Sequence, residues 1–203
     1  MTRPDIWRLV HIERVALIAD LEQLSSEQWQ TASLCEGWTI HDVAAHLSDS
    51  ARTSRVSFAV DLVRARFDFD AQNARGIARE RGVSPTFTLG RLREAAKLTK
   101  TPPAPLASRL VEEIVHGEDI RRPLGITRSY PPDAVVLALE YQLRTSASMG
   151  GARELLTAVR LVATDVSFAV GEGPEVRGPV LELLLTTAGR AGAEIDGPGV
   201  SLL

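Results

Sequence analysis

Apolar residues recur at helical spacing through most of the first 150 residues. Between about Asp5 and Leu24, apolar side chains such as Ile6, Val10 and Leu17 fall on one face of a helix. The consecutive prolines of TPPAP interrupt this periodicity, because proline cannot continue a helix. The polar segment 67–88 predicts only a short helix and loops. Four further helices are predicted, over about residues 39–66, 89–100, 106–122 and 132–149.

The pattern changes after residue 150, where glycines become frequent. LVATDVSFAV alternates in part and contains β-branched residues, which predicts one strand, and GEGPEVRG predicts a turn with a short strand. An apolar helix is expected from Val180 to Gly189, followed by one or two short strands in GAEIDGPGVSLL. The predicted fold class is therefore mostly α, with a four-helix bundle over residues 1–150 followed by a small α/β domain over residues 151–203.

The clearest local signal is the start of the second helix in CEGWTIHDVAAHL. Thr39 is a good N-cap residue, and Asp42 follows three positions later, as in a capping box. Trp38 before the cap and Val43 at the fourth helical position can form a hydrophobic staple. His46, three residues after Val43, then lies among the apolar positions of this helix.

Composition narrows the chemistry that this chain can carry. Of its 203 residues, 44% are hydrophobic and 24% are charged, which is typical of a globular protein. The single cysteine, Cys35, excludes an intramolecular disulfide and a cysteine-rich zinc finger. Any metal site must therefore draw on carboxylates and on four histidines, which are His11, His41, His46 and His116.

Charge and targeting signals constrain the function less than the cysteine and histidine content does. Residues 51–100 hold 11 basic and 5 acidic residues in a chain of net charge −3, which suits either an anionic ligand or a solvated helix face. Few aromatic residues accompany these arginines, so we expect no nucleic-acid partner. The N-terminus lacks the pattern of a signal peptide, and no segment approaches the ~20 apolar residues of a membrane span. We therefore expect a cytoplasmic protein without a membrane partner.

Glu112 and His116 lie four residues apart in RLVEEIVHGEDI. Residues at this spacing share one helix face, so both side chains can reach one metal ion, although an ion pair or a hydrogen-bonded histidine explains the spacing equally well. His46 on a second helix of the bundle would complete a set of two histidines and one glutamate. Three such ligands leave a fourth position open, which is typical of catalytic zinc.

These residues resemble a known family. GWTIHDVAAHL, followed some 60 residues later by EEIVHGEDIRRPLG, is similar to the mycothiol-dependent maleylpyruvate isomerase family of DinB-like, metal-binding four-helix bundles. The resemblance implies that His46, Glu112 and His116 bind the metal, with Glu113 as the rival to Glu112. It also implies that Arg190, in LELLLTTAGRAG, binds a substrate carboxylate, although a helix C-terminus alone explains an arginine there. Residues 68–105 depart from the family's usual insert, which leaves the substrate open.

The resemblance further implies a divalent metal, zinc by expectation, and mycothiol or a similar thiol as cofactor. A metal can deprotonate a coordinated thiol, and the thiolate is the nucleophile. Its addition to the double bond of a small electrophilic acid such as maleylpyruvate would permit rotation, and elimination would give the trans isomer. The alternatives are thiol transfer, metal-dependent hydrolysis with bound water as nucleophile, and non-catalytic binding of a small ligand. The sequence leaves the oligomeric state open, a homodimer included.

We do not assign the remaining polar residues to the chemistry of the site. We expect Asp42 to cap its helix and Asp119 to accept a hydrogen bond from His116. His11 is expected to be structural and His41 to be exposed. Cys35 is expected to be a small loop residue, since no base is evident near it in the sequence.

Overall fold

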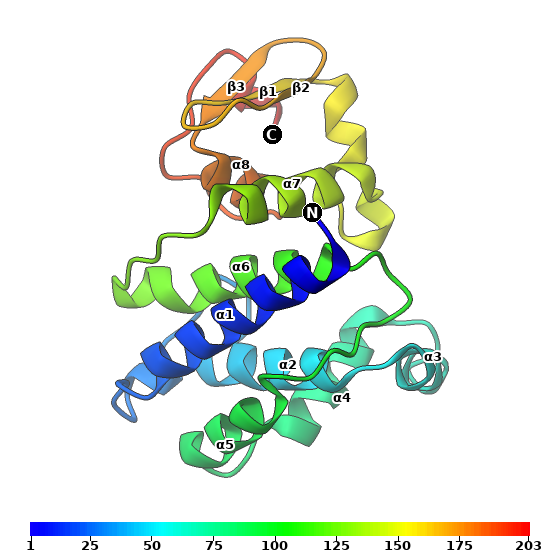
Figure 1. Ribbon diagram of the computed structural model, residues 1–203, viewed down its shortest axis with the longest axis vertical. Helices are drawn as coiled ribbons and strands as arrows, with labels where there is room; N and C mark the ends of the chain where they lie inside the picture. The colour runs from blue at the N-terminus through cyan, green and yellow to red at the C-terminus, as the bar shows by residue number, and fades with distance from the viewer. The chain divides into compact units, whose positions relative to one another are not determined.

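A computed structural model describes all 203 residues, Met1 to Leu203. The contacts divide the chain into two compact units, Met1–Arg128 and Ser129–Leu203. The sequence had placed this boundary at residue 150. It falls earlier because helix α7 (Pro132–Arg144) packs on helix α8 (Val180–Thr187) and so belongs to the second unit (Figure 1).

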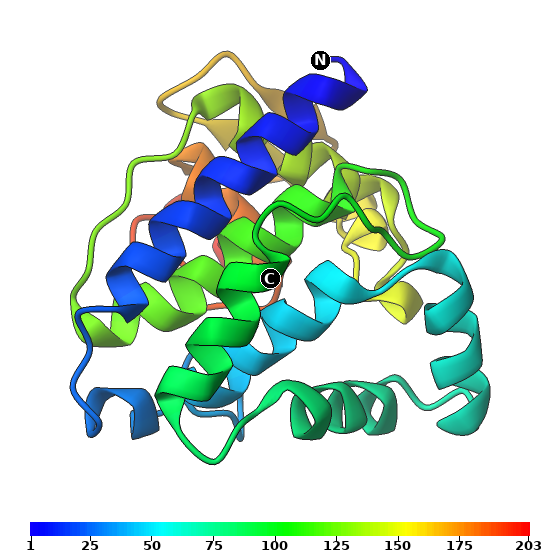
Figure 2. The ribbon, with the colours of Figure 1, turned by 60° about the horizontal axis from the view of Figure 1, so that its bottom comes forward.

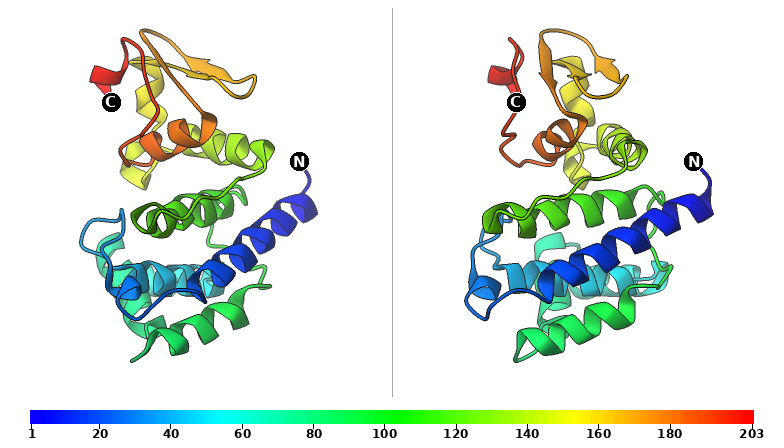
Figure 3. Two further views of the ribbon diagram at one scale, coloured as in Figure 1. Left: turned by 90° about the vertical axis from the view of Figure 1, so that its left-hand side faces the viewer. Right: turned by 60° about the vertical axis from the view of Figure 1, so that its left-hand side comes forward.

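Four helices of the first unit form the bundle, and each packs on two others. Helices α1 and α2 both contact α5 and α6, so the four close a ring around one core (Figures 1 and 3). The four are α1 (Arg3–Leu21), α2 (Ile40–Arg52), α5 (Pro85–Ala95) and α6 (Ser108–Arg121). The predicted fold class, mostly α with a four-helix bundle and a small α/β part, is confirmed.

The core of the bundle is aliphatic. Leu17 and Leu21 of α1 pack with Ile40 and Leu47 of α2, and with Ile120 of α6, all at most 2% exposed. Complete burial of one such side chain contributes about 1.5–3 kcal/mol relative to leaving it in water. These contacts fix the packing of α2 against α6, the two helices that carry the candidate site.

The predicted capping box at the start of α2 is present. The Asp42 backbone N–H donates to Thr39 Oγ1 at 3.3 Å, and the Thr39 backbone N–H donates to Asp42 Oδ2 at 2.9 Å. Two N–H groups that the helix itself leaves unpaired are thereby satisfied, which typically stabilises a helix by about 1 kcal/mol. Trp38 packs against the core cluster that contains Val43.

The predicted single helix over residues 39–66 is in fact two helices. Helix α2 ends at Arg52, Thr53 is extended, and Ser54 caps α3 (Arg55–Arg64) by accepting a hydrogen bond from the Ser57 backbone N–H. Serine and threonine side chains compete for backbone N–H groups in this way, and hydrophobic periodicity does not detect the competition. Helix α3 buries none of its residues and contacts α4 (Phe69–Glu80), which packs on α2 (Figure 2).

The second unit places a small sheet over α8 (Figure 3). Strand β1 (Arg160–Ala163) pairs antiparallel with β2 (Ala169–Gly171) and parallel with β3 (Glu175–Gly178). The predicted strand over 161–170 is therefore a hairpin, closed where the Ala163 N–H donates to Phe168 O at 2.9 Å. Residues 192–203 form no strand beyond one bridge between Arg177 and Asp196, because turns and a short 3₁₀ helix occupy them.

Five 3₁₀ helices complete the chain. They are η1 (Gln28–Gln30), η2 (Arg122–Leu124), η3 (Ala147–Met149), η4 (Arg153–Thr157) and η5 (Val200–Leu202). None of the helices combines the length and the apolar composition needed to cross a lipid bilayer.

Candidate metal centre

The structure brings His46, Glu112 and His116 together between α2 and α6. Glu112 Oε2 lies 3.4 Å from His46 Nε2 and 4.0 Å from His116 Nε2, and the three ligand atoms all lie within 4.8 Å of one another. Tetrahedral zinc, with bonds of about 2.0–2.2 Å, holds its ligand atoms roughly 3.3–3.6 Å apart. A small inward movement of these side chains would give that spacing, so the donor set fits a divalent metal.

Local structure explains why these three side chains converge. His46 lies seven residues after the Thr39 cap, which is close to two helical turns, on the face of α2 that packs on α6. Glu112 and His116 are one turn apart on α6 and therefore share a face. The imidazole rings of His46 and His116 meet edge to face, with centroids 4.8 Å apart.

Asp119 orients His116. Its Oδ2 lies 2.8 Å from His116 Nδ1, and Asp119 is fully buried. A carboxylate only accepts, so this contact assigns the hydrogen to Nδ1 and leaves the lone pair of Nε2 free on the side of Glu112. Such a hydrogen bond to the second nitrogen is usual for metal-binding histidines, and it matches the expectation for Asp119.

The charges around Glu112 favour its ionised form. Burial alone would raise the pKa of Glu112, but the hydrogen bond with His46 opposes burial. The positive charge of Arg109 and the electrostatic effect of the two histidines act in the same direction, and together they hold the pKa of this carboxyl well below its usual range. Glu112 is therefore a carboxylate at neutral pH, the form in which it can bind a cation.

Glu113, the rival ligand, faces a different partner. Its Oε1 accepts a hydrogen bond from Arg14 Nε of α1 at 2.7 Å, and both side chains are at most 3% exposed. Burial raises the pKa of Glu113, against the opposing charges of Arg14 and Arg109. Glu113 is thus engaged in a buried ion pair, whereas Glu112 faces the histidines, as the i to i+4 spacing predicted.

Two further side chains adjoin the cluster. The Trp38 ring lies 5.2 Å from the His46 ring and is nearly parallel to the His116 ring at 6.5 Å. The Cys35 thiol donates to Asp119 Oδ2 at 3.0 Å and lies 3.6 Å from His116 Nδ1. Cys35 lies in a loop, as expected, but bases do lie close to it in space, because α6 brings both groups to it from more than 80 residues away.

The other residues named from the sequence are not among these contacts. His11 stacks on Trp7 and lies 3.4 Å from the Leu98 carbonyl oxygen, which agrees with its expected structural role. Asp42 caps α2 as expected. Arg190 belongs to the second unit, where its Nη1 donates to the Ala188 carbonyl oxygen beyond the end of α8.

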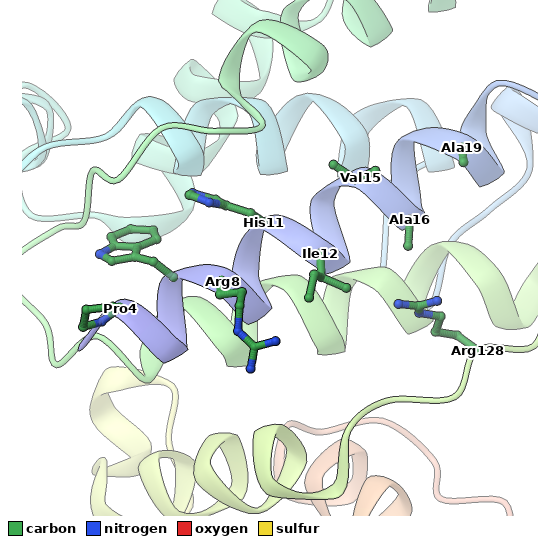
Figure 4. A pocket seen from close by; sticks show the side chains of 9 residues that line it. Pro4, Arg8, His11, Ile12, Val15, Ala16, Ala19 and Arg128 are labelled. Atoms are coloured by element: carbon green, nitrogen blue, oxygen red, sulfur yellow. The ribbon is translucent and has the colours of Figure 1, made fainter. Parts of the chain in front are cut away.

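A separate apolar groove of about 840 Å³ runs along α1 (Figure 4). Trp7, His11, Ile12 and Val15 line it, and Arg128 stands at one end. None of the three candidate metal ligands lines this groove, so the groove is separate from the candidate metal centre.

The fold and the site define a class of protein, and comparison with known proteins shows a family resemblance. The first unit is a DinB-like four-helix bundle with a cluster of two histidines and one glutamate between its helices. The family model described as the mycothiol maleylpyruvate isomerase N-terminal domain matches residues 10–104. Residues 10–104 thus match a domain of the mycothiol-dependent maleylpyruvate isomerase family, in agreement with the resemblance of the sequence motifs.

Solved structures agree with this assignment at the level of the fold. Two crystal structures of mycothiol-dependent maleylpyruvate isomerase, one of them a histidine-to-alanine mutant, match the chain with a TM-score of 0.64. Each match covers 98% of this chain and 93% of the other, at 16% sequence identity. No curated protein sequence matches the chain.

His41 was expected to be exposed, but it is only 2% exposed. Its Nε2 lies 2.7 Å from Thr88 Oγ1, which itself accepts a hydrogen bond from the Gly82 N–H. The Trp29 ring meets it edge to face at 5.4 Å. Burial lowers the pKa of His41, and the charge of Arg81 adds to this effect against the opposing charge of Asp42. The imidazole is therefore neutral in the folded protein.

This burial predicts an acid-sensitive fold. Below about pH 6.5 the unfolded chain protonates His41 while the folded chain does not, so the free energy of unfolding should fall as pH falls from 7 to 5. The substitution His41→Gln should flatten this dependence. Urea unfolding of both proteins at pH 5, 6, 7 and 8 measures it. Equal slopes below pH 7 in the two proteins would contradict the prediction.

Proposed function

We propose that His46, Glu112 and His116 bind a divalent metal, zinc by their chemistry, and that the chain is a thiol-dependent enzyme acting on a small electrophilic acid. The convergence of two imidazole nitrogens and one ionised carboxylate on one point is the observation that carries this proposal. The thiol is mycothiol or a similar low-molecular-weight thiol, and the reaction is cis–trans isomerisation or thiol transfer. The family supports both parts.

Each residue around the proposed metal has its own role. When bound, the metal supplies a positive charge that lowers the pKa of a coordinated thiol and favours the nucleophilic thiolate. Glu112 offsets part of that charge, and Asp119 holds His116 with Nε2 directed toward Glu112. The Trp38 ring, within 6.5 Å of both imidazoles, limits the access of water to the cluster from its side.

Arg190 completes the proposal as the group that binds a substrate carboxylate. Its planar guanidinium can donate two parallel hydrogen bonds to such a group. The support is the family's motif, in which an arginine follows a leucine-rich helix and a glycine; here Gly189 and Arg190 follow α8 directly.

Metal analysis tests the ligand set. The purified wild type should hold about one divalent ion per chain, as a site of three protein ligands does. His46→Ala and His116→Ala should each lose most of it, while His11→Ala, a histidine outside the cluster, should retain it. Elemental analysis after dialysis gives the stoichiometry. A metal-free wild type, or full retention by both cluster variants, would refute the site.

Thiol dependence tests the reaction class. Turnover of an electrophilic cis-unsaturated acid such as maleylpyruvate should require added mycothiol and should fall to background without it. Mixing the metal-loaded protein with substrate, with and without the thiol, and following the trans isomer measures this. A hydrolytic product formed at the same rate without thiol would instead favour a bound-water nucleophile. Ligand binding without any turnover would favour a binding protein.

Arg190→Met should weaken substrate binding. Loss of a charge-assisted bidentate contact typically costs about 1.5–3 kcal/mol, so kcat/KM for an acid substrate should fall roughly 10- to 100-fold. The bound metal should be unchanged in this variant. An ester of the same substrate, which lacks the carboxylate, should show no difference between the two proteins. An equal loss on acid and ester would contradict this role for Arg190.

A further inference from the structure

Besides the two histidines, a half-buried serine and a buried arginine contact Glu112. Arg109 is 4% exposed, and its Nη1 donates to Ser50 Oγ at 2.6 Å. The Ser50 hydroxyl in turn donates to Glu112 Oε2 at 3.2 Å. The other carboxylate oxygen, Oε1, lies 3.7 Å from Arg109 Nη2. Both oxygens of Glu112 are therefore contacted by this pair.

The direction of these hydrogen bonds is fixed by chemistry. A guanidinium can only donate, so Ser50 Oγ must accept from Arg109. The hydroxyl hydrogen of Ser50 is then left for Glu112, which as a carboxylate can only accept. Arg109 thus acts on Glu112 partly through Ser50.

The oxygen held by Ser50 is also the one that faces the imidazoles. Glu112 Oε2 is the atom 3.4 Å from His46 Nε2 and 4.0 Å from His116 Nε2, while Oε1 turns toward Arg109. A glutamate side chain has several rotatable bonds, and a free carboxylate would sample other orientations. Here their contacts distinguish the two oxygens, since Oε2 faces Ser50 and the imidazoles whereas Oε1 faces Arg109.

We propose that Ser50 and Arg109 are positioning residues that hold Glu112 with one oxygen directed at His46 and His116. The inference rests on the proposed metal site and adds that its carboxylate arm is prearranged by α2 and by the preceding turn of α6. The ordering of Glu112 is then achieved on folding, so it does not weaken metal binding. With Oε1 paired with Arg109, Glu112 would offer its other oxygen, Oε2, to the metal.

The chain contains a close internal control. Ser48, two residues before Ser50 on α2, is fully buried and donates to Glu80 Oε2 at 2.8 Å. Glu80 also receives hydrogen bonds from Arg91 at 2.7 and 3.0 Å, so this trio has the same three types of side chain as Ser50, Glu112 and Arg109, but here the arginine donates to the carboxylate and not to the serine. It faces no histidine of the metal cluster. If loss of a serine hydroxyl acts only by destabilising the fold, Ser48→Ala should therefore weaken metal binding as much as Ser50→Ala does.

Cobalt binding measures the positioning directly. Co²⁺ titrated into the metal-free full-length protein reports affinity by competition with a chelator, and its visible absorption reports coordination geometry. Ser50→Ala should weaken Co²⁺ binding about 10- to 100-fold, the usual effect of losing a hydrogen bond to a metal ligand, and should change the spectrum. Ser48→Ala should leave both unchanged and lower only the melting temperature of the metal-free protein.

A second pair of variants separates the loss of the hydroxyl group from an effect on folding. Ser50→Thr and Ser50→Val have the same shape, but only threonine keeps the hydroxyl. The threonine variant should bind Co²⁺ as the wild type does, and the valine variant should resemble Ser50→Ala. Equal affinities and spectra within this pair would overturn the inference, and so would equal values for Ser50→Ala and Ser48→Ala.

The two proposals fail in different ways. If the wild type binds Co²⁺ and His46→Ala does not, but the serine variants are indistinguishable, the metal site stands and the positioning role falls. If the wild type takes up neither Co²⁺ nor Zn²⁺, both the site and its positioning residues are refuted.

Discussion

The first unit depends on the pairing of buried charges along α6. This helix places Arg109, Glu113 and Arg121 in the interior, each at most 4% exposed, and each needs a partner because a lone buried charge is costly. Arg109 binds Ser50 of α2, and Glu113 binds Arg14 of α1 at 2.7 Å. Arg121 Nε donates to Asp20 of α1 at 2.7 Å. Removing one partner of a fully buried ion pair such as Arg14–Glu113 typically costs about 3–5 kcal/mol, and together these contacts favour one register of α6 on its two neighbours.

That register gives two adjacent glutamates different roles. Successive residues of a helix point about 100° apart, so when Glu113 faces Arg14, Glu112 must face α2. The Arg14–Glu113 ion pair thereby places the carboxylate of Glu112 next to His46, which lies two turns after the N-cap of α2. The ion pair that stabilises the bundle and the cluster that we propose to bind the metal are consequently two faces of one helix turn.

Local sequence signals predict part of this fold and of the candidate site. The Thr39 cap, the i to i+4 spacing of α6 and the mostly helical class each depend on residues close in sequence, and the structure has all three. The helix break at Thr53, the hairpin between β1 and β2 and the boundary at residue 128 depend on side-chain competition or on distant contacts. The surroundings of His41 and Cys35 likewise come from residues 47 and more than 80 positions away, which no periodicity reveals.

The position of the only cysteine bears on why an outside thiol is needed under the proposed function. Cys35 is the sole thiol of the chain, yet its sulfur lies beside His116 Nδ1 and donates to Asp119. The two nitrogens of an imidazole point to different sides of the ring, so this thiol is on the side away from Nε2 and Glu112. Turning it toward the cluster would break its hydrogen bond to Asp119 and disturb the contact that orients His116. Under the proposed function, a metal held by His46, Glu112 and His116 would therefore keep its fourth position for a ligand from solution, which is where a low-molecular-weight thiol would bind.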